Sequence, residues 1–174
     1  TITVSPTALP NASSGTAYSV SLTGSGAVAP YTFTITGGAL PAGLALAPGG
    51  QIAGTPTASG NFPFEVTARD TNGQTSQARL TLTVDVPTLT VTPATLPNAV
   101  QGVAYSQTLT VSGGIAPYRF SIGSGSLPAG LSLDPVRGII SGTPTGSGTA
   151  NFAVTVTDST GGTPASATVA YSLQ

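Results

Sequence analysis

The sequence predicts an all-β fold made of two tandem antiparallel β-sandwiches, each with about seven strands in Greek-key order. Three observations lead to this prediction. Apolar residues alternate with Thr and Ser over short stretches, the period of two that half-buried strands show. The 174 residues include 23 Gly and 15 Pro, which mark turns between those stretches. The third observation is that the chain repeats itself from end to end.

The repeat defines the domains. TITVSPTALPNASSG at 1–15 returns as TLTVTPATLPNAVQG at 88–102, and GTPTASG at 54–60 returns as GTPTGSG at 142–148. A copy of about 87 residues is long enough to bury a core of its own. We therefore expect one module at 1–86 and a second at 87–174. A small insertion near Pro164 is then expected to align Leu80, Leu82 and Val84 with Val169, Tyr171 and Leu173.

The strands of the first copy follow from this alternation, taken in chain order. After a first short strand, Tyr18, Val20 and Leu22 share one face, and Phe33 and Ile35 alternate with threonines. Threonine suits the outward positions because its branched β-carbon fits a pleated surface. The same alternation returns before Asp70 and again before Asp85. We expect strands near 1–4, 17–23, 31–36, 44–46, 51–53, 62–69 and 77–84, and the same order in the second copy.

The phrase ALPAGLALAPGGQIAGTP at 39–56 supplies the two short strands in the middle. Pro41 presets φ for a tight turn and Gly43 relieves its end, so that Leu44 and Leu46 enter a strand. The next strand ends at Thr55-Pro56, because a proline removes an N–H and keeps the preceding residue extended. This phrase and its second copy at 126–144 are predicted to be scaffold.

The composition excludes several functional classes. Only 5% of residues are charged, the net charge is −1, and the chain has no Lys, His, Cys, Met or Trp. We expect no nucleic-acid partner, because no basic patch is available for phosphates, and no membrane insertion, because no apolar run is long enough. The chain is expected not to be an enzyme: no His, Cys or Lys is available, and the acids are scattered in sequence. These acids are Glu65, Asp70, Asp85, Asp134 and Asp158.

Both copies carry LPAGL, GTPT and an Asp-x-x-Gly after the sixth strand, in the same order. This combination resembles the immunoglobulin-like domains of bacterial surface proteins, which are relatives of the cadherin-like domains of dystroglycan-type ectodomains. The resemblance covers nearly the whole chain. It implies tandem immunoglobulin-like sandwiches in a secreted or wall-attached protein, and some cadherin-like relatives bind calcium between domains. The paired cysteines and the buried tryptophan of true immunoglobulin domains are absent.

Calcium is the one metal that the residues suggest. It takes six to eight oxygen ligands. In the second module the loops after the second, fourth and sixth strands are expected at the end where the first strand enters. Asp134, Asp158 and the linker residue Asp85 are therefore candidate ligands of a calcium ion at the junction. The alternative is structural: Asp134 caps its own turn or pairs with Arg137, and Asp158, like Asp70, closes an Asx-type turn.

The predicted function is a non-catalytic stalk, spacer or adhesin segment of a larger bacterial surface protein. It is expected to be extracellular, at the cell surface or secreted, monomeric, cofactor-free apart from the calcium hypothesis, and joined to flanking domains of a longer polypeptide. The alternative is a carbohydrate-binding accessory module of a secreted polysaccharide-degrading enzyme, which requires a patch of exposed tyrosines. Tyr31 and Tyr118, which follow Ala-Pro, are expected in the core, and their exposure would favour this alternative. A self-associating adhesin is a third possibility.

Overall fold

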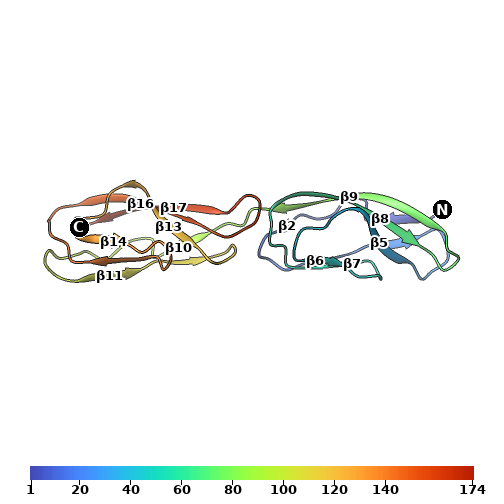
Figure 1. The fold of residues 1–174 in the computed structure, drawn as a ribbon, viewed down its shortest axis with the longest axis horizontal. Helices are drawn as coiled ribbons and strands as arrows, with labels where there is room; N and C mark the ends of the chain where they lie inside the picture. Colours follow the sequence, from blue (N-terminus) through green and yellow to red (C-terminus); the bar gives the residue numbers. More distant parts are fainter. The chain divides into compact units, whose positions relative to one another are not determined.

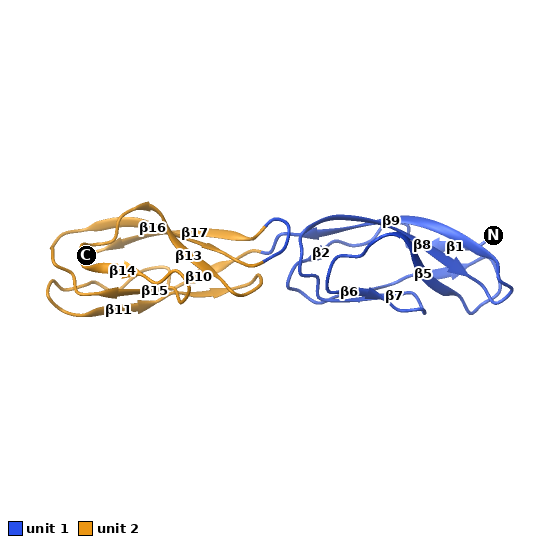
Figure 2. Ribbon diagram, viewed as in Figure 1, with its two compact units in different colours: residues 1–87, 160–163 blue, residues 88–159, 164–174 orange.

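A computed structural model describes all residues 1–174 and contains strands but no helix (Figure 1). The predicted all-β fold class is confirmed. The chain forms two compact units, coloured separately in Figure 2. Unit 1 comprises Thr1–Pro87 and the short segment Thr160–Thr163, and unit 2 comprises Thr88–Ser159 and Pro164–Gln174. No helix is present that could cross a membrane.

Unit 1 is a sandwich of short strands. One sheet has the order β2-β9-β8-β5, a second has the order β3-β7-β6, and β1 pairs with β4. All pairs are antiparallel except β2 with β9. The strands are β1 (Thr3–Ser5), β2 (Ala12–Ser13), β3 (Tyr18–Ser21), β4 (Thr23–Ser25), β5 (Thr32–Gly38), β6 (Leu44–Leu46), β7 (Gln51–Gly54), β8 (Gly60–Arg69) and β9 (Thr75–Asp85).

Unit 2 repeats this plan. Its sheets have the orders β13-β16-β17, β11-β15-β14 and β10-β12. Unit 2 forms no strand at the position that corresponds to β2. At this position the Ala99 N–H donates a hydrogen bond to the Gln174 C=O. The strands are β10 (Thr90–Thr92), β11 (Tyr105–Thr108), β12 (Thr110–Ser112), β13 (Arg119–Gly125), β14 (Leu131–Leu133), β15 (Ile139–Gly142), β16 (Ala150–Thr157) and β17 (Ser166–Leu173).

Each unit buries its own apolar core between its sheets. In unit 1 the fully buried side chains include Leu22, Ile52 and Leu82, and in unit 2 they include Ile140 and Leu173. No buried side-chain nitrogen or oxygen lacks a hydrogen-bond partner. Most of the residues that alternate inward in the sequence form these cores, because a two-residue period places them on one face of each strand. Ile35 is the exception: it was expected to face inward with Phe33 and is 36% exposed, next to the β-bulge in β5.

Three details differ from the sequence prediction. The strand expected at 17–23 is split at Leu22, whose N–H donates to Gly50 C=O, so its two parts join different sheets. The strand β2 was not predicted. The alignment of the last strands is wrong by two residues: Phe64 pairs with Leu80 and Phe152 with Tyr171, so Leu80 corresponds to Tyr171 and Leu82 to Leu173.

The cause of this misalignment is the loop between the last two strands. Between β8 and β9 the loop covers five residues, 70–74, and between β16 and β17 it covers eight, 158–165. In both units the aspartate N–H at the start donates to the carbonyl at the end, from Asp70 to Gln74 and from Asp158 to Ala165, each at 3.0 Å. The insertion is therefore three residues long, instead of the single residue that the expected alignment implies.

Candidate functional site

Asp134 holds the turn between β14 and β15. Its Oδ1 accepts the N–H groups of Val136 and Arg137, each at 2.9 Å. These two backbone hydrogen bonds lower the pKa of the Asp134 carboxyl below its usual value, because they favour the charged form. Asp134 thus does what the structural alternative predicts: it caps its own turn.

Asp158 and Asp70 occupy equivalent positions at the ends of β16 and β8. Asp158 accepts the Ala165 N–H at 2.7 Å through Oδ1 and the Ile115 N–H at 2.9 Å through Oδ2. Asp70 accepts the Gln74 N–H at 2.8 Å and the Val28 N–H at 3.5 Å. Both carboxylates are buried, and they join the last hairpin to the β4–β5 loop in unit 1 and to the β12–β13 loop in unit 2. They close Asx-type turns, as the structural alternative predicts, and also brace a second loop.

Asp85 ends β9 in unit 1. Its exposed carboxylate accepts the side-chain N–H of Asn11, with Oδ2 at 3.1 Å. No group of three or more Asp or Glu side chains is placed to hold a metal ion. The calcium site assigned to Asp85, Asp134 and Asp158 stays a prediction from the sequence.

A different surface feature recurs in both units and was not predicted. We call it the bulge hollow, because it lies beside the β-bulge in β5 or β13. In unit 1 it has a volume of about 500 Å³ and in unit 2 about 350 Å³. The unit 1 hollow is lined by Gly37, Gly38, Pro63, Phe64, Glu65, Arg79, Leu80 and Thr81. The unit 2 hollow is lined by Ser124, Asn151, Phe152, Ala153, Ala170, Tyr171 and Ser172.

The bulge explains why a hollow forms at this place. In unit 1, Ile35 pairs with Val66 and Gly37 with Glu65, so Thr36 is the extra residue. In unit 2 the extra residue is Gly123. A Cβ on Gly123 would lie 2.6 Å from Thr155 Oγ1, so a side chain there would displace this hydroxyl. The bulge bends the strand away from the ladder and leaves the surface of the last hairpin open.

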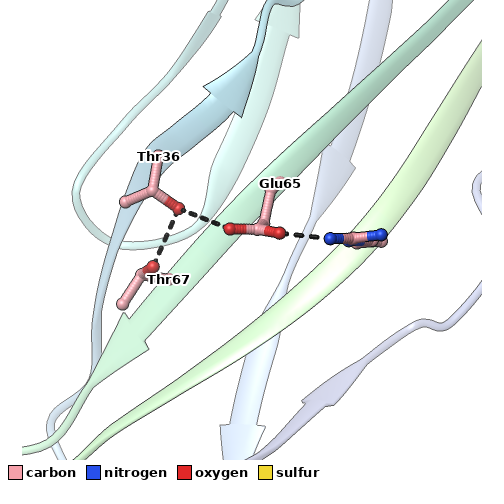
Figure 3. A network of polar contacts seen from close by, with 4 residues as sticks. Thr36, Glu65 and Thr67 are labelled. Atoms are coloured by element: carbon pink, nitrogen blue, oxygen red, sulfur yellow. Dashed lines mark hydrogen bonds and ion pairs between the residues drawn. The ribbon is translucent and has the colours of Figure 1, made fainter.

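Unit 1 carries a polar network over its hollow, shown in Figure 3. Arg79 Nε donates to Glu65 Oε2 at 3.1 Å across the β8–β9 pair. The hydroxyl of the bulged Thr36 lies 3.5 Å from Glu65 Oε1 and 2.9 Å from Thr67 Oγ1. The Arg79 side chain is 90% exposed, so water screens this ion pair strongly.

Unit 2 has no charge at the corresponding positions. Ala153 pairs with Ala170 where Glu65 pairs with Arg79. The two hollows therefore share a backbone shape and differ in chemistry. The sequence prediction placed Glu65 among the scattered acids and did not pair it with Arg79. Their spacing around a five-residue loop is the signal that could have paired them, since it places them opposite each other in a hairpin.

All five tyrosine hydroxyls donate to a backbone carbonyl of their own unit. Tyr18 and Tyr105 donate to Pro10 and Pro97, and Tyr171 donates to Pro93. Burial raises the pKa of these three phenols above the usual value of 10.0.

Tyr31 and Tyr118 make the same kind of hydrogen bond at the edge of each core. They donate to Ala27 and Gly113 at 2.8 and 2.6 Å. Both pack against the buried cores, as predicted. All five tyrosines are buried or half-buried, so they do not form the patch of exposed tyrosines that the carbohydrate-binding alternative requires.

Comparison with known proteins identifies the type of module. The family model described as "Putative Ig domain" (He_PIG) matches residues 1–85 and again residues 87–174. No curated protein matches the chain.

Solved structures are similar only distantly. The endo-fucoidan hydrolase MfFcnA4 of glycoside hydrolase family 107 is 20% identical, with a TM-score of 0.44 over 97% of this chain and 27% of that one. The protocadherin GammaB4 extracellular domain is 16% identical, with a TM-score of 0.40 over 99% and 34%. Mouse Cadherin-23 EC22–24 is 13% identical, with a TM-score of 0.40 over 100% and 66%. This chain spans about a quarter to a third of the first two.

Proposed function

The chain belongs to the He_PIG family of immunoglobulin-like domains over both of its halves, and from this premise we propose that it is a non-catalytic stalk or spacer segment of a larger extracellular protein. Its task is to separate the domains that flank it, at a cell surface or in a secreted protein. An adhesive role is the second form of the same proposal, in which the surface of one unit binds a cell-surface ligand.

The observation that carries the proposal is that the polar groups of each unit serve its own fold. The carboxylates of Asp70, Asp134 and Asp158 accept backbone N–H groups. The tyrosine hydroxyls donate to backbone carbonyls, and no buried polar side-chain atom is left unpaired. A ligand or substrate site typically presents convergent polar groups that the fold does not consume. A module whose polar groups are used within its own fold adds length and stability to the protein that contains it.

An extracellular location fits the composition. The cores are complete without cysteine, and the chain carries 5% charged residues, with Thr, Ser and Gly on its strands and turns. Such a surface offers few sites for electrostatic capture of nucleic acid or of anionic lipid. The extracellular location is part of the proposal.

The spacer function can be tested by inserting the chain between a membrane anchor and a fluorescent reporter domain on a cell. We expect the reporter to lie farther from the membrane with one inserted chain than with none, and farther again with two chains in tandem. Axial fluorescence localisation or energy transfer to a membrane dye measures this distance. A reporter distance that does not increase with the number of chains would contradict the spacer function.

The adhesive form needs a separate measurement. Beads coated with the purified chain are exposed to a panel of polysaccharides and to beads coated with the same chain. The spacer proposal predicts no retention in either case. Retention on polysaccharide would support the carbohydrate-binding alternative, and bead clustering would support a self-associating adhesin.

A further inference from the structure

Unit 1 includes a short segment from far along the sequence, Thr160–Thr163, which lies in the loop between β16 and β17 (Figure 2). Gly161 N–H donates to Thr57 C=O at 2.9 Å, and Ser59 N–H donates to Gly161 C=O at 3.0 Å. Ala58 and Gly161 form a parallel β-bridge. The segment is thus held as a minimal added strand.

Two serine side chains complete this contact. Ser59 Oγ donates to Thr163 C=O at 2.9 Å and accepts the Thr163 N–H at 3.2 Å. Ser14 Oγ and Thr160 Oγ1 lie 3.3 Å apart, and these two residues are 1% and 3% exposed. We call the surface made by Ser14 and residues 57–59 the loop seat of unit 1. It buries polar atoms whose partners are supplied by the segment.

The glycines of the segment permit this close approach. Gly162 has φ +77°, and a Cβ there would lie 2.7 Å from Ser59 C=O. A Cβ on Gly161 would lie 3.2 Å from Ala58 Cβ. The seat is therefore matched to a glycine-containing loop, and the segment lies in the 158–165 loop, which is three residues longer than the 70–74 loop.

Unit 2 has a surface at the place that corresponds to the loop seat. Gln101 and residues 145–147 stand where Ser14 and residues 57–59 stand in unit 1. They border a pocket of about 340 Å³ to which Gln101, Gly146 and Ser147 contribute. Ser147 is exposed, whereas Ser59 is buried.

One side chain in this pocket makes a hydrogen bond equivalent to one that the segment makes in unit 1. Gln101 Nε2 donates to Thr145 C=O at 2.9 Å. The corresponding carbonyl in unit 1, that of Thr57, accepts the Gly161 N–H at the same distance. The amide of Gln101 satisfies the carbonyl from an exposed position, where it can be displaced by a backbone N–H.

We propose that this pocket of unit 2 is a seat for the loop between the last two strands of a further module of the same family in the same polypeptide. The partner is an extended, glycine-containing loop that donates an N–H to Thr145 C=O and accepts the Ser147 N–H. The loop of unit 1 itself, 70–74, is three residues too short to supply this segment. The inference rests on the pairing inside unit 1 and holds whether the chain is a spacer or an adhesin.

Because the chain has no cysteine, introduced cysteine pairs report the contact without background. The double variant Ala58→Cys and Gly161→Cys tests the pairing in the existing chain. We expect a disulfide under mild oxidation, since the Cβ separation of 3.2 Å is close to the roughly 3.5–4.5 Å of disulfides. Failure of this pair to cross-link would overturn the premise.

The proposal itself is tested in a chain extended after Gln174 by a second copy of residues 84–174. Gly146→Cys is placed in unit 2, where a Cβ meets no atom within 4 Å, and Gly161→Cys in the added copy. We expect this pair to cross-link at a rate comparable with that of the Ala58–Gly161 pair. Gln101→Ser should accelerate the reaction, because it removes the competing donor.

Three controls decide between occupants. Val136→Cys, exposed on another turn of unit 2, combined with the same added cysteine gives the rate of chance collision. An added copy whose loop is replaced by the sequence of 70–74, with Gly73→Cys, should cross-link no faster than this. A seat pair that reacts at the chance rate overturns the proposal. Equally fast cross-linking between separate two-unit chains, one with each cysteine, also overturns it and identifies a second copy as the occupant.

Discussion

Units 1 and 2 share their turns and cores and differ in their last hairpin. LPAGL and GTPT stand at the same places in both, and most buried core residues of one unit have a buried counterpart in the other, although the buried Ala165 lies in the longer loop and has none. In the hairpin, Glu65 and Arg79 are replaced by Ala153 and Ala170, and the loop is longer by three residues. The difference teaches that the scaffold tolerates change on the outer face and in the loop of this hairpin.

The largest expected effect tests the corrected correspondence between the cores. Leu82→Ala in unit 1 and Leu173→Ala in unit 2 each remove a fully buried side chain. Each should lower the stability of its own unit by about 2–5 kcal/mol, because a cavity is left behind. Calorimetry should show one lowered melting transition per variant. Loss from Leu173→Ala of under 1 kcal/mol, in rough terms, would contradict the equivalence with Leu82.

The second prediction compares the two loop aspartates. Asp158→Asn should cost unit 2 about 1–3 kcal/mol, since one of two short bonds to backbone N–H groups is lost. Asp70→Asn should cost unit 1 less, because its bond to Val28 is already long at 3.5 Å. Urea unfolding of both variants measures the difference. An equal or larger loss of stability in Asp70→Asn would show that these hydrogen bonds do not contribute as their distances in the structure imply.

The third prediction concerns alkaline pH. A phenol whose pKa is raised by folding stabilises the native state below its unfolded pKa of about 10, and this contribution is lost as the pH rises through the raised value. Unit 2 has two such phenols, Tyr105 and Tyr171, and unit 1 has Tyr18. Above pH 10 the melting transition of unit 2 should fall faster than that of unit 1. Tyr171→Phe should reduce this difference, and absorbance at alkaline pH should show one fewer late-ionising phenol.

The ion pair over the hollow of unit 1 should contribute little. Replacing both Glu65 and Arg79 by Ala imitates unit 2 and should change stability by under about 1 kcal/mol, because the Arg79 side chain is 90% exposed. The change should shrink further in high salt. A larger, salt-independent loss would show that the network with Thr36 and Thr67 acts as a unit, which a double-mutant cycle can measure.

The smallest expected effect is that of calcium. The carboxylates of Asp134 and Asp158 already accept backbone N–H groups, and no acidic cluster is formed. We therefore expect the same melting temperatures in millimolar calcium and in excess chelator. A rise in calcium that disappears in Asp134→Ala and Asp158→Ala would establish the site predicted from the sequence.

Periodicity and turn residues were enough to predict the fold class and most strands, because inward positions recur every second residue. They could not fix the alignment of β9 with β17. A shift of two residues keeps every apolar side chain on the same face, so the pattern allows Leu80 to be aligned with Val169 as well as with Tyr171, its counterpart in the structure. Only the length of the loop before these strands decides the alignment, and the hydrophobic pattern does not show this length.

The candidate site was less predictable than the fold. The roles of Asp70 and Asp134 in their turns follow from local chemistry, and the sequence suggested them. The bulge hollow depends on an extra residue, Thr36 or Gly123. Thr36 gives no local signal, whereas a glycine within a strand, such as Gly123, often marks a bulge. The association of Thr160–Thr163 with residues 57–59 joins positions far apart in sequence, which a residue pattern does not reveal.

The unlike hairpins also bear on how the chain reaches its native state. Tandem modules of similar sequence are prone to exchange strands while they fold. If β9 added to β16 in place of β17, Arg79 would face the buried Ala153, Glu65 would lose its cationic partner, and Leu80 would replace Tyr171 beside Phe152. Each mismatch disfavours the exchanged pairing. Divergence at this hairpin therefore helps each copy to fold with its own strand, while the shared turns are free to stay alike.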